Sequence, residues 1–209
     1  MSKSKTKSLS YTICLLVVIQ LLLVGLKQFS FIFVERTNFS DSVSTMFAMI
    51  ILIGLFLVFT KKQKITLSIF PRAFNKFYVI GTCIAAALFI ATPSNYTDGF
   101  QAILLLIYGS IVTPVFEELI FRGYVWNKLN TVFEKEWVSY IVSTVLFGIW
   151  HLGYVYSIAF RVETGLATVM MWKVIVGLCY GVVLGALRLK TKNCYSTILL
   201  HGVANIFGG

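Results

Sequence analysis

Long apolar stretches separated by short polar segments run through the whole chain. Most of them have the roughly 17–25 residues that a helix needs to cross a hydrocarbon layer about 30 Å thick. We therefore predict an all-α protein, a polytopic membrane helix bundle with about seven transmembrane helices, the last of them short. The stretches occupy approximately residues 9–28, 43–60, 77–93, 101–122, 137–153, 166–187 and 194–209.

Composition agrees with a membrane setting. Hydrophobic residues make up 58% of the 209 residues and charged residues only 12%, about half of what is typical of a soluble domain. The mean hydropathy is +0.86. No repeat, low-complexity tract or long linker divides the sequence, so we expect a single membrane domain over residues 1–209. The four cysteines are dispersed, which predicts neither a disulfide framework nor a zinc knuckle.

The net charge of +10 comes from basic residues concentrated in alternate loops. The loops on the side of the N-terminus contain most of the lysines and arginines, whereas the opposite loops contain only Lys27, Arg36 and Arg161. The positive-inside rule therefore predicts a cytoplasmic N-terminus in a multi-pass protein of the cell membrane. The first stretch lacks a small-x-small cleavage site, so we interpret it as an uncleaved helix. Because lipid and topology explain the basic excess, nucleic-acid binding is not expected.

Two glutamates and an arginine interrupt the fourth apolar stretch, and the only two histidines, His151 and His201, lie in later ones. An ionisable side chain at the centre of a membrane helix costs about 2.5–3.5 kcal/mol, so such a set indicates a function. Glu118 and Arg122 have the i,i+4 spacing of an ion pair that supports the helix. Glu117 lacks a local partner, which leaves it free to face a cavity.

The depth of these groups follows from helix rise. Counted from the cytoplasmic helix ends, Glu117 and His151 each lie about 20 Å along their helices, and His201 and Asn205 lie at about 14 and 20 Å on one helix face. A buried carboxylate with a nearby imidazole is suited to activating water, which predicts this role for Glu117 with His151. An imidazole and an amide N–H can stabilise an oxyanion, which predicts that role for His201 with Asn205.

Three short motifs in separate stretches carry these residues. Together they resemble the motifs of the CAAX protease and bacteriocin-processing family, also called the Abi family of intramembrane endopeptidases. The resemblance covers roughly residues 110–207, and only four residues follow Asn205, so we expect no further helix there. The motifs are Glu117-Glu118-x-x-x-Arg122, Phe147-x-x-x-His151 and His201-x-x-x-Asn205.

The resemblance implies a multi-pass protease with the same division of roles, in which Glu117 and His151 activate water and His201 and Asn205 bind the oxyanion. Phe147 is expected to shape and dry the pocket. The catalytic helices would lie within residues 101–209, with accessory spans and basic loops in residues 1–100. The family includes enzymes that trim prenylated CAAX proteins and bacterial members tied to bacteriocin maturation, immunity or peptide signalling. This chain looks like a bacterial member, located in the plasma membrane.

Three alternatives stay open at this point. Glu117, His151 and His201 are also the ligand types of a catalytic zinc site, although the sequence contains no H-E-x-x-H motif, and we expect no cofactor. The same residues could form a proton or ion relay in a small transporter. The chain could also be a non-catalytic immunity or regulatory protein. For the protease, a pocket among apolar helices favours a hydrophobic or lipid-anchored peptide or protein substrate.

Overall fold

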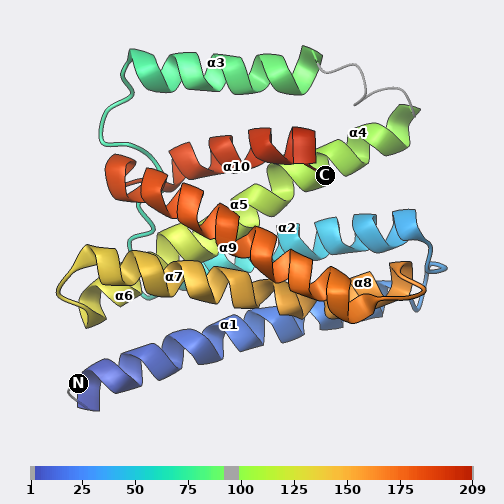
Figure 1. Cartoon of the computed structure of the whole chain (residues 1–209), viewed down its shortest axis with the longest axis horizontal. Coiled ribbons are helices and arrows are strands. Elements are labelled where there is room, and N and C mark those ends of the chain that lie inside the picture. The colour runs from blue at the N-terminus through green and yellow to red at the C-terminus, as the bar shows by residue number, and fades with distance from the viewer. Residues whose placement is uncertain (1–2, 92–98, 209) are drawn as a thin grey trace.

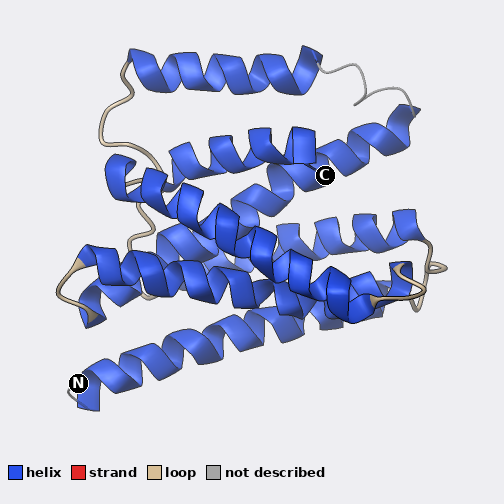
Figure 2. Ribbon diagram, in the orientation of Figure 1, coloured by secondary structure: helices blue, strands red, loops and turns tan. Residues whose placement is uncertain are grey.

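The structure, a computed structural model, describes residues 3–91 and 99–208, and within these residues every regular element is a helix (Figure 2). The prediction of an all-α fold is therefore confirmed. The elements are α1 (Lys3–Ser30), α2 (Asn38–Lys62), α3 (Lys76–Ala91), α4 (Gly99–Ile107), η2 (Tyr108–Val112), α5 (Thr113–Glu118), η3 (Leu119–Val125), α6 (Trp126–Val132), α7 (Glu136–Trp150), η4 (His151–Tyr154), α8 (Val155–Arg161), α9 (Leu166–Thr191) and α10 (Cys194–Gly208).

Five helical segments in the described part of the chain are long and apolar enough to cross a membrane. Two shorter apolar helices, α3 and α10, coincide with the other two predicted stretches. Residues 92–93 and 209, at the ends of those stretches, lie outside the described residues. The count of seven crossings and the cytoplasmic N-terminus thus stay predictions. The five segments are Lys5–Ser30, Asn38–Lys62, Gly99–Val132, Glu136–Arg161 and Leu166–Thr191.

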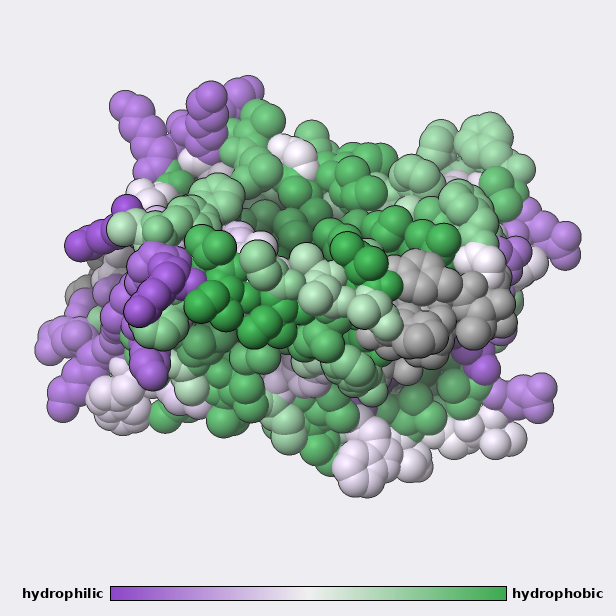
Figure 3. All heavy atoms as spheres, turned by 90° about the horizontal axis from the view of Figure 1, so that it is seen from above, coloured by the Kyte–Doolittle hydropathy of each residue, from purple (hydrophilic) through white to green (hydrophobic). Residues whose placement is uncertain are grey.

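The long helices lie roughly along one direction and form a layered bundle, with α1 at one edge and α3 at the other (Figure 1). On the face that Figure 3 shows, hydrophilic side chains gather at the two ends of the molecule, and most side chains between them are apolar. This distribution is that of a protein whose middle faces lipid and whose ends face water.

The centre of the bundle is the segment from α5 to α6. Phe116, Phe121, Tyr124 and Trp126 are all buried there, although the segment carries both glutamates of the first motif. Two π-helical stretches flank α5: η2 precedes it, and η3 follows it within this segment. Single π turns inside α-helices leave backbone carbonyls without their usual donors and frequently occur at functional sites.

Asp41 forms salt bridges with the three basic residues that the sequence analysis assigned to the loops opposite the N-terminus. Its carboxylate lies 2.8 Å from Lys27 Nζ, 2.9 Å from Arg36 Nη2 and 3.0 Å from Arg161 Nη2. Asp41 is fully buried, and it lies in the first turn of α2, which begins at Asn38, several residues before the predicted stretch. The sequence analysis missed this cluster, since it interpreted the three cations only as topology signals.

Candidate active site

Pro114 lies at the start of α5 and determines how the neighbouring helix is attached. In the π-helical register of η2 the N–H of Thr113 donates to the carbonyl of Tyr108, so the carbonyl of Gly109 would receive its donor from residue 114. Proline has no N–H. The carbonyl of Gly109 instead accepts a 2.8 Å hydrogen bond from Asn205 Nδ2, which joins α10 to the fourth span.

A second feature lets α10 approach this closely. Gly202 lies directly against the carbonyl of Ser110, and a Cβ atom at that position would overlap the carbonyl oxygen. Glycine therefore permits backbone contact between α10 and η2. The contact brings His201, the preceding residue of α10, into the buried centre of the bundle, where it is 4% exposed.

Glu118 contacts two basic side chains through one oxygen. Arg122 Nη1 donates to Glu118 Oε1 at 3.0 Å, the i,i+4 ion pair expected from the sequence. His201 Nδ1 lies 3.1 Å from the same oxygen, a contact between distant helices that the sequence did not indicate. The guanidinium of Arg122 also lies 4.2 Å from the ring centre of Phe147, which suits a cation–π interaction.

The hydrogen bond to Glu118 determines which nitrogen of His201 carries the proton. An ionised carboxylate accepts hydrogen bonds and cannot donate them, so His201 Nδ1 must be the donor. In the neutral ring, Nε2 then has a free lone pair. This nitrogen faces Glu117 Oε2 at 3.9 Å, and Glu117 is 2% exposed. The two motif residues therefore lie side by side in the core.

Tyr154 is the partner of the other oxygen of Glu117. Its hydroxyl donates a 2.6 Å hydrogen bond to Glu117 Oε1 and accepts a 3.0 Å bond from Trp150 Nε1. The sequence analysis missed Tyr154. A usable signal was present, because Tyr154 follows His151 by three residues and one helical turn places both on the same side.

His151 begins the 3₁₀ turn η4, immediately after α7. Its Nδ1 lies 2.8 Å from the carbonyl oxygen of Phe147 and must donate to it, which leaves Nε2 as an acceptor in the neutral ring. The imidazole packs against Gly177 of α9, where a Cβ atom would come within 2.6 Å of Nδ1. Its ring centre is 5.9 Å from that of Tyr154, so Tyr154 contacts His151 with its ring and Glu117 with its hydroxyl.

Both the nitrogen and the oxygen of the Asn205 side-chain amide form hydrogen bonds. Nδ2 donates to the carbonyl of Gly109, and Oδ1 accepts a 3.1 Å hydrogen bond from the hydroxyl of Tyr180. The Tyr180 ring in turn lies 5.2 Å from the His201 ring, centre to centre. One N–H of the Asn205 amide remains beyond the bond to Gly109. Tyr180 was not identified from the sequence, since it lies in a different span with no motif around it.

In the zinc alternative Glu117, His151 and His201 would be the metal ligands. Within residues 3–91 and 99–208, no group of three or more His, Cys, Asp or Glu side chains is placed to hold a metal ion. The Nδ1 atoms of both histidines are engaged by protein acceptors, Phe147 and Glu118. Each histidine keeps Nε2 as its other ring nitrogen, and an acceptor on Nδ1 is compatible with either mechanism.

In a comparison with protein-family models, a family model matches residues 99–207, which run from α4 to α10 and include every motif residue described above. The matching family is described as type II CAAX prenyl endopeptidase, Rce1-like. Comparisons with curated proteins and with solved structures gave no match.

Proposed function

Because the chain belongs to the Rce1-like family of type II CAAX prenyl endopeptidases, we propose that it is an intramembrane endopeptidase that uses water activated by Glu117. The observation that supports this most directly is the buried contact of Glu117 with Tyr154 on one oxygen and with His201 on the other side. Ionisable groups converging inside a membrane protein mark a functional site. The proposed substrate is a hydrophobic or lipid-anchored peptide or protein.

In the proposed reaction Glu117 is the general base. Because the Tyr154 hydroxyl donates a hydrogen bond to Glu117 Oε1, the proposal assigns the contact with water to the other oxygen, Oε2. A water molecule at Oε2 would give its proton to the carboxylate while its oxygen attacks the carbonyl carbon of the peptide bond. The same carboxyl group would then transfer the proton to the departing amine. A base enclosed by apolar side chains is suited to this exchange because bulk water does not compete.

The proposed roles of the other motif residues follow their hydrogen bonds. His151 Nε2 can accept a hydrogen bond from the attacking water. The ring proton is on Nδ1, which donates it to the carbonyl of Phe147. Asn205 can offer its remaining N–H to the oxyanion. His201 can donate from Nε2 only when its ring carries a second proton, and the Glu118 carboxylate, 3.1 Å from Nδ1, compensates that charge. Glu118 and Arg122 would serve as positioning residues for His201.

Comparative peptidomics of membranes that contain either the native chain or the Glu117→Gln variant tests the proposal. Glutamine keeps the shape and accepts the Tyr154 hydrogen bond but cannot take a proton from water, so we expect cleavage products to disappear. Glu134→Gln is the matched control, since Glu134 is 90% exposed in its side chain and lies outside the site. Indistinguishable peptidomes from the native and Glu117→Gln proteins, made at equal levels, would overturn the assignment.

We also propose that the reaction needs no metal ion. Purified protein treated with a chelator should retain its cleavage rate, and elemental analysis should find less than one zinc per chain. Loss of activity that zinc alone restores would instead assign Glu117, His151 and His201 to a metal site formed in another conformation. This outcome leaves the protease function standing and changes only its chemistry.

A further inference from the structure

α3 stands at the edge of the bundle, where it packs against α10 (Figure 1). None of its residues is buried. Two polar contacts join its first half to the start of α10: Asn193 Nδ2 donates to the hydroxyl of Tyr78 at 3.0 Å, and the hydroxyls of Thr82 and Tyr195 are 2.6 Å apart. A helix held in this way leaves space along its side.

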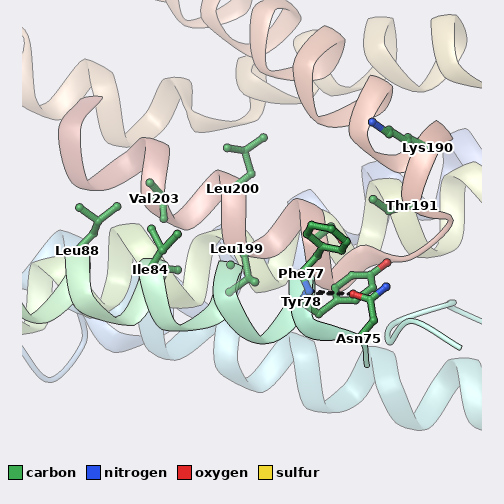
Figure 4. A pocket seen from close by; sticks show the side chains of 13 residues that line it. Asn75, Phe77, Tyr78, Ile84, Leu88, Lys190, Thr191, Leu199, Leu200 and Val203 are labelled. Carbon is green, nitrogen blue, oxygen red and sulfur yellow. Dashed lines mark hydrogen bonds between the residues drawn. The ribbon is translucent and has the colours of Figure 1, made fainter. Parts of the chain in front are cut away.

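A groove of about 570 Å³ fills the space between α3 and the end of α9 together with α10. This volume lies within the roughly 300–1,000 Å³ that is usual for ligand sites. Figure 4 shows side chains of both helices pointing into it. The apolar walls include Phe77, Ile84 and Leu88 of α3 and Leu199, Leu200 and Val203 of α10.

The groove is polar at one end and apolar along the rest of its length. Lys190, Thr191 and Asn75 surround the polar end, whereas Leu88 and Val203 lie at the opposite end (Figure 4). A groove of this kind matches a molecule with a charged or polar head and an apolar tail. A peptide segment fits the apolar part poorly, since its backbone N–H and C=O groups would find no partners there.

The length of the apolar part of the groove indicates which kind of apolar tail fits it. Eleven helical steps separate Phe77 from Leu88, which corresponds to about 16 Å along the axis of α3. Half of a hydrocarbon layer about 30 Å thick is about 15 Å. The apolar part of the groove is therefore as long as one fatty-acyl chain of a bilayer leaflet.

We propose that this groove binds an anionic phospholipid, with one acyl chain between α3 and α10 and its phosphate beside Lys190. The charge of the polar end matches such a head group, because Lys76 begins α3 at the same end as Lys190. A basic side chain near an anionic lipid surface favours binding by about fivefold. This inference goes beyond the proposed protease function and does not depend on it.

The lipid would support the face of α10 opposite its motif residues. Leu199 and Val203 line the groove, and each lies about 160° around the helix from His201, which points into the buried centre toward Glu118. A bound acyl chain would therefore fill the space behind the helix that carries His201 and Asn205.

Native mass spectrometry of the full-length protein, with phosphatidylglycerol and phosphatidylcholine offered together, tests the proposal. We expect one retained phosphatidylglycerol per chain, preferred over phosphatidylcholine by about fivefold. Lys190→Gln should abolish the preference while leaving lipid binding. Gly81→Leu should abolish retention, because a Cβ at Gly81 meets nothing within 4 Å and a leucine would extend into the groove without distorting the helix.

Two substitutions elsewhere serve as controls. Gly54→Leu adds the same side chain to an exposed position of α2 that is equally open, and Lys62→Gln removes an exposed lysine from the end of α2. Both should bind lipid as the native protein does. The proposal would be overturned if the Gly81→Leu variant retained as much phosphatidylglycerol as the native protein. It would also be overturned if the Gly54→Leu variant lost as much of this lipid as the Gly81→Leu variant. Displacement of phosphatidylglycerol by farnesyl-cysteine methyl ester at equal concentration would overturn it too and assign the groove to a lipidated substrate.

Discussion

Glu117 and Glu118 are neighbours in the chain, yet their surroundings in the structure give them different tasks. Glu118 faces a buried guanidinium and an imidazole at once, through a single oxygen. Glu117 receives a hydrogen bond from an uncharged hydroxyl on one oxygen, and its other oxygen lies 3.9 Å from the imidazole of His201. These contacts suit Glu117 to the proposed proton transfer and Glu118 to the proposed positioning of its neighbours.

This difference predicts unequal effects of two isosteric substitutions on stability. Glu118→Gln leaves the buried Arg122 without its counter-charge, and breaking a buried pair in this way costs about 3–5 kcal/mol. We expect a clear fall in melting temperature together with loss of cleavage. Glu117→Gln should abolish cleavage with almost no change in melting temperature. Thermal unfolding of both variants in the same detergent measures this, and equal melting temperatures would contradict the assignment.

Tyr154 gives a second prediction for a single residue. Tyr154→Phe keeps the ring but removes the hydrogen bond to Glu117 Oε1, and a hydrogen bond to a charged group contributes about 1.5–3 kcal/mol. If that contribution is made in the transition state, the cleavage rate should fall by about 10–100-fold. Initial rates on a substrate identified by peptidomics measure it. Tyr156→Phe is the control, because the Tyr156 ring stacks 4.1 Å from Arg36, outside the site; equal losses in both variants would exclude a specific role for Tyr154.

The sequence allowed some of these residues to be predicted and not others, for a physical reason. Spacing along one helix determines which side chains share a face, so the Glu118–Arg122 ion pair was accessible from i,i+4 alone. Glu118 and His201 are 83 residues apart in the sequence, and their contact depends on how two different helices are rotated and how closely they pack. Nothing in the local pattern encodes that geometry, and Tyr180 was missed for the same reason, whereas the spacing of Tyr154 from His151 was a local signal that the sequence analysis did not use.

At the scale of elements, the attachment of α10 to η2 depends on Pro114 and Gly202 together. The proline frees the carbonyl that Asn205 binds, and the glycine lets the two backbones meet. Hydrophobic patterning located both helices but did not predict the π-helical stretches or the 3₁₀ turn at His151–Tyr154. These interruptions leave the apolar periodicity almost unchanged, so a pattern based on periodicity does not detect them.

Gly202→Ala tests this contact. The added methyl group would overlap the carbonyl of Ser110, and overpacking of this kind costs about 1–3 kcal/mol. We expect a lower melting temperature and reduced cleavage, because α10 carries His201 and Asn205. Gly54→Ala is the matched control, since its Cβ meets nothing within 4 Å. It should be neutral or slightly stabilising, as alanine is the better helix former. Two variants with the same stability would show that the close approach is not required.

For the whole molecule, the predictions concern the number of apolar helices that cross the bilayer and the direction of the first one. α3 and α10 have 16 and 15 residues, so each crosses only a thin layer, at about 24 Å and 22 Å of helix length. We propose seven crossings with a cytoplasmic N-terminus, because the basic loops all fall on one side in that arrangement. The division into accessory residues 1–100 and catalytic residues 101–209 stays a prediction.

Labelling of single cysteines with a membrane-impermeant maleimide determines the direction. In a chain whose four native cysteines are replaced, Glu35→Cys should react in intact cells, whereas Glu134→Cys should react only after the membrane is opened. Both positions lie in loops, between α1 and α2 and between α6 and α7 respectively. The reverse pattern would place the N-terminus outside and would invalidate the charge argument.

The cluster around Asp41 also bears on the order in which the chain assembles. Lys27, Arg36 and Asp41 emerge from the ribosome together, but Arg161 follows 120 residues after the aspartate that it binds. The first two helices can therefore pair early, while the far end of α8 can dock on them only after the helices between have been made. Since α8 continues directly from the turn that carries His151 and Tyr154, the residues of the proposed catalytic centre can come together only after these later helices have been synthesised.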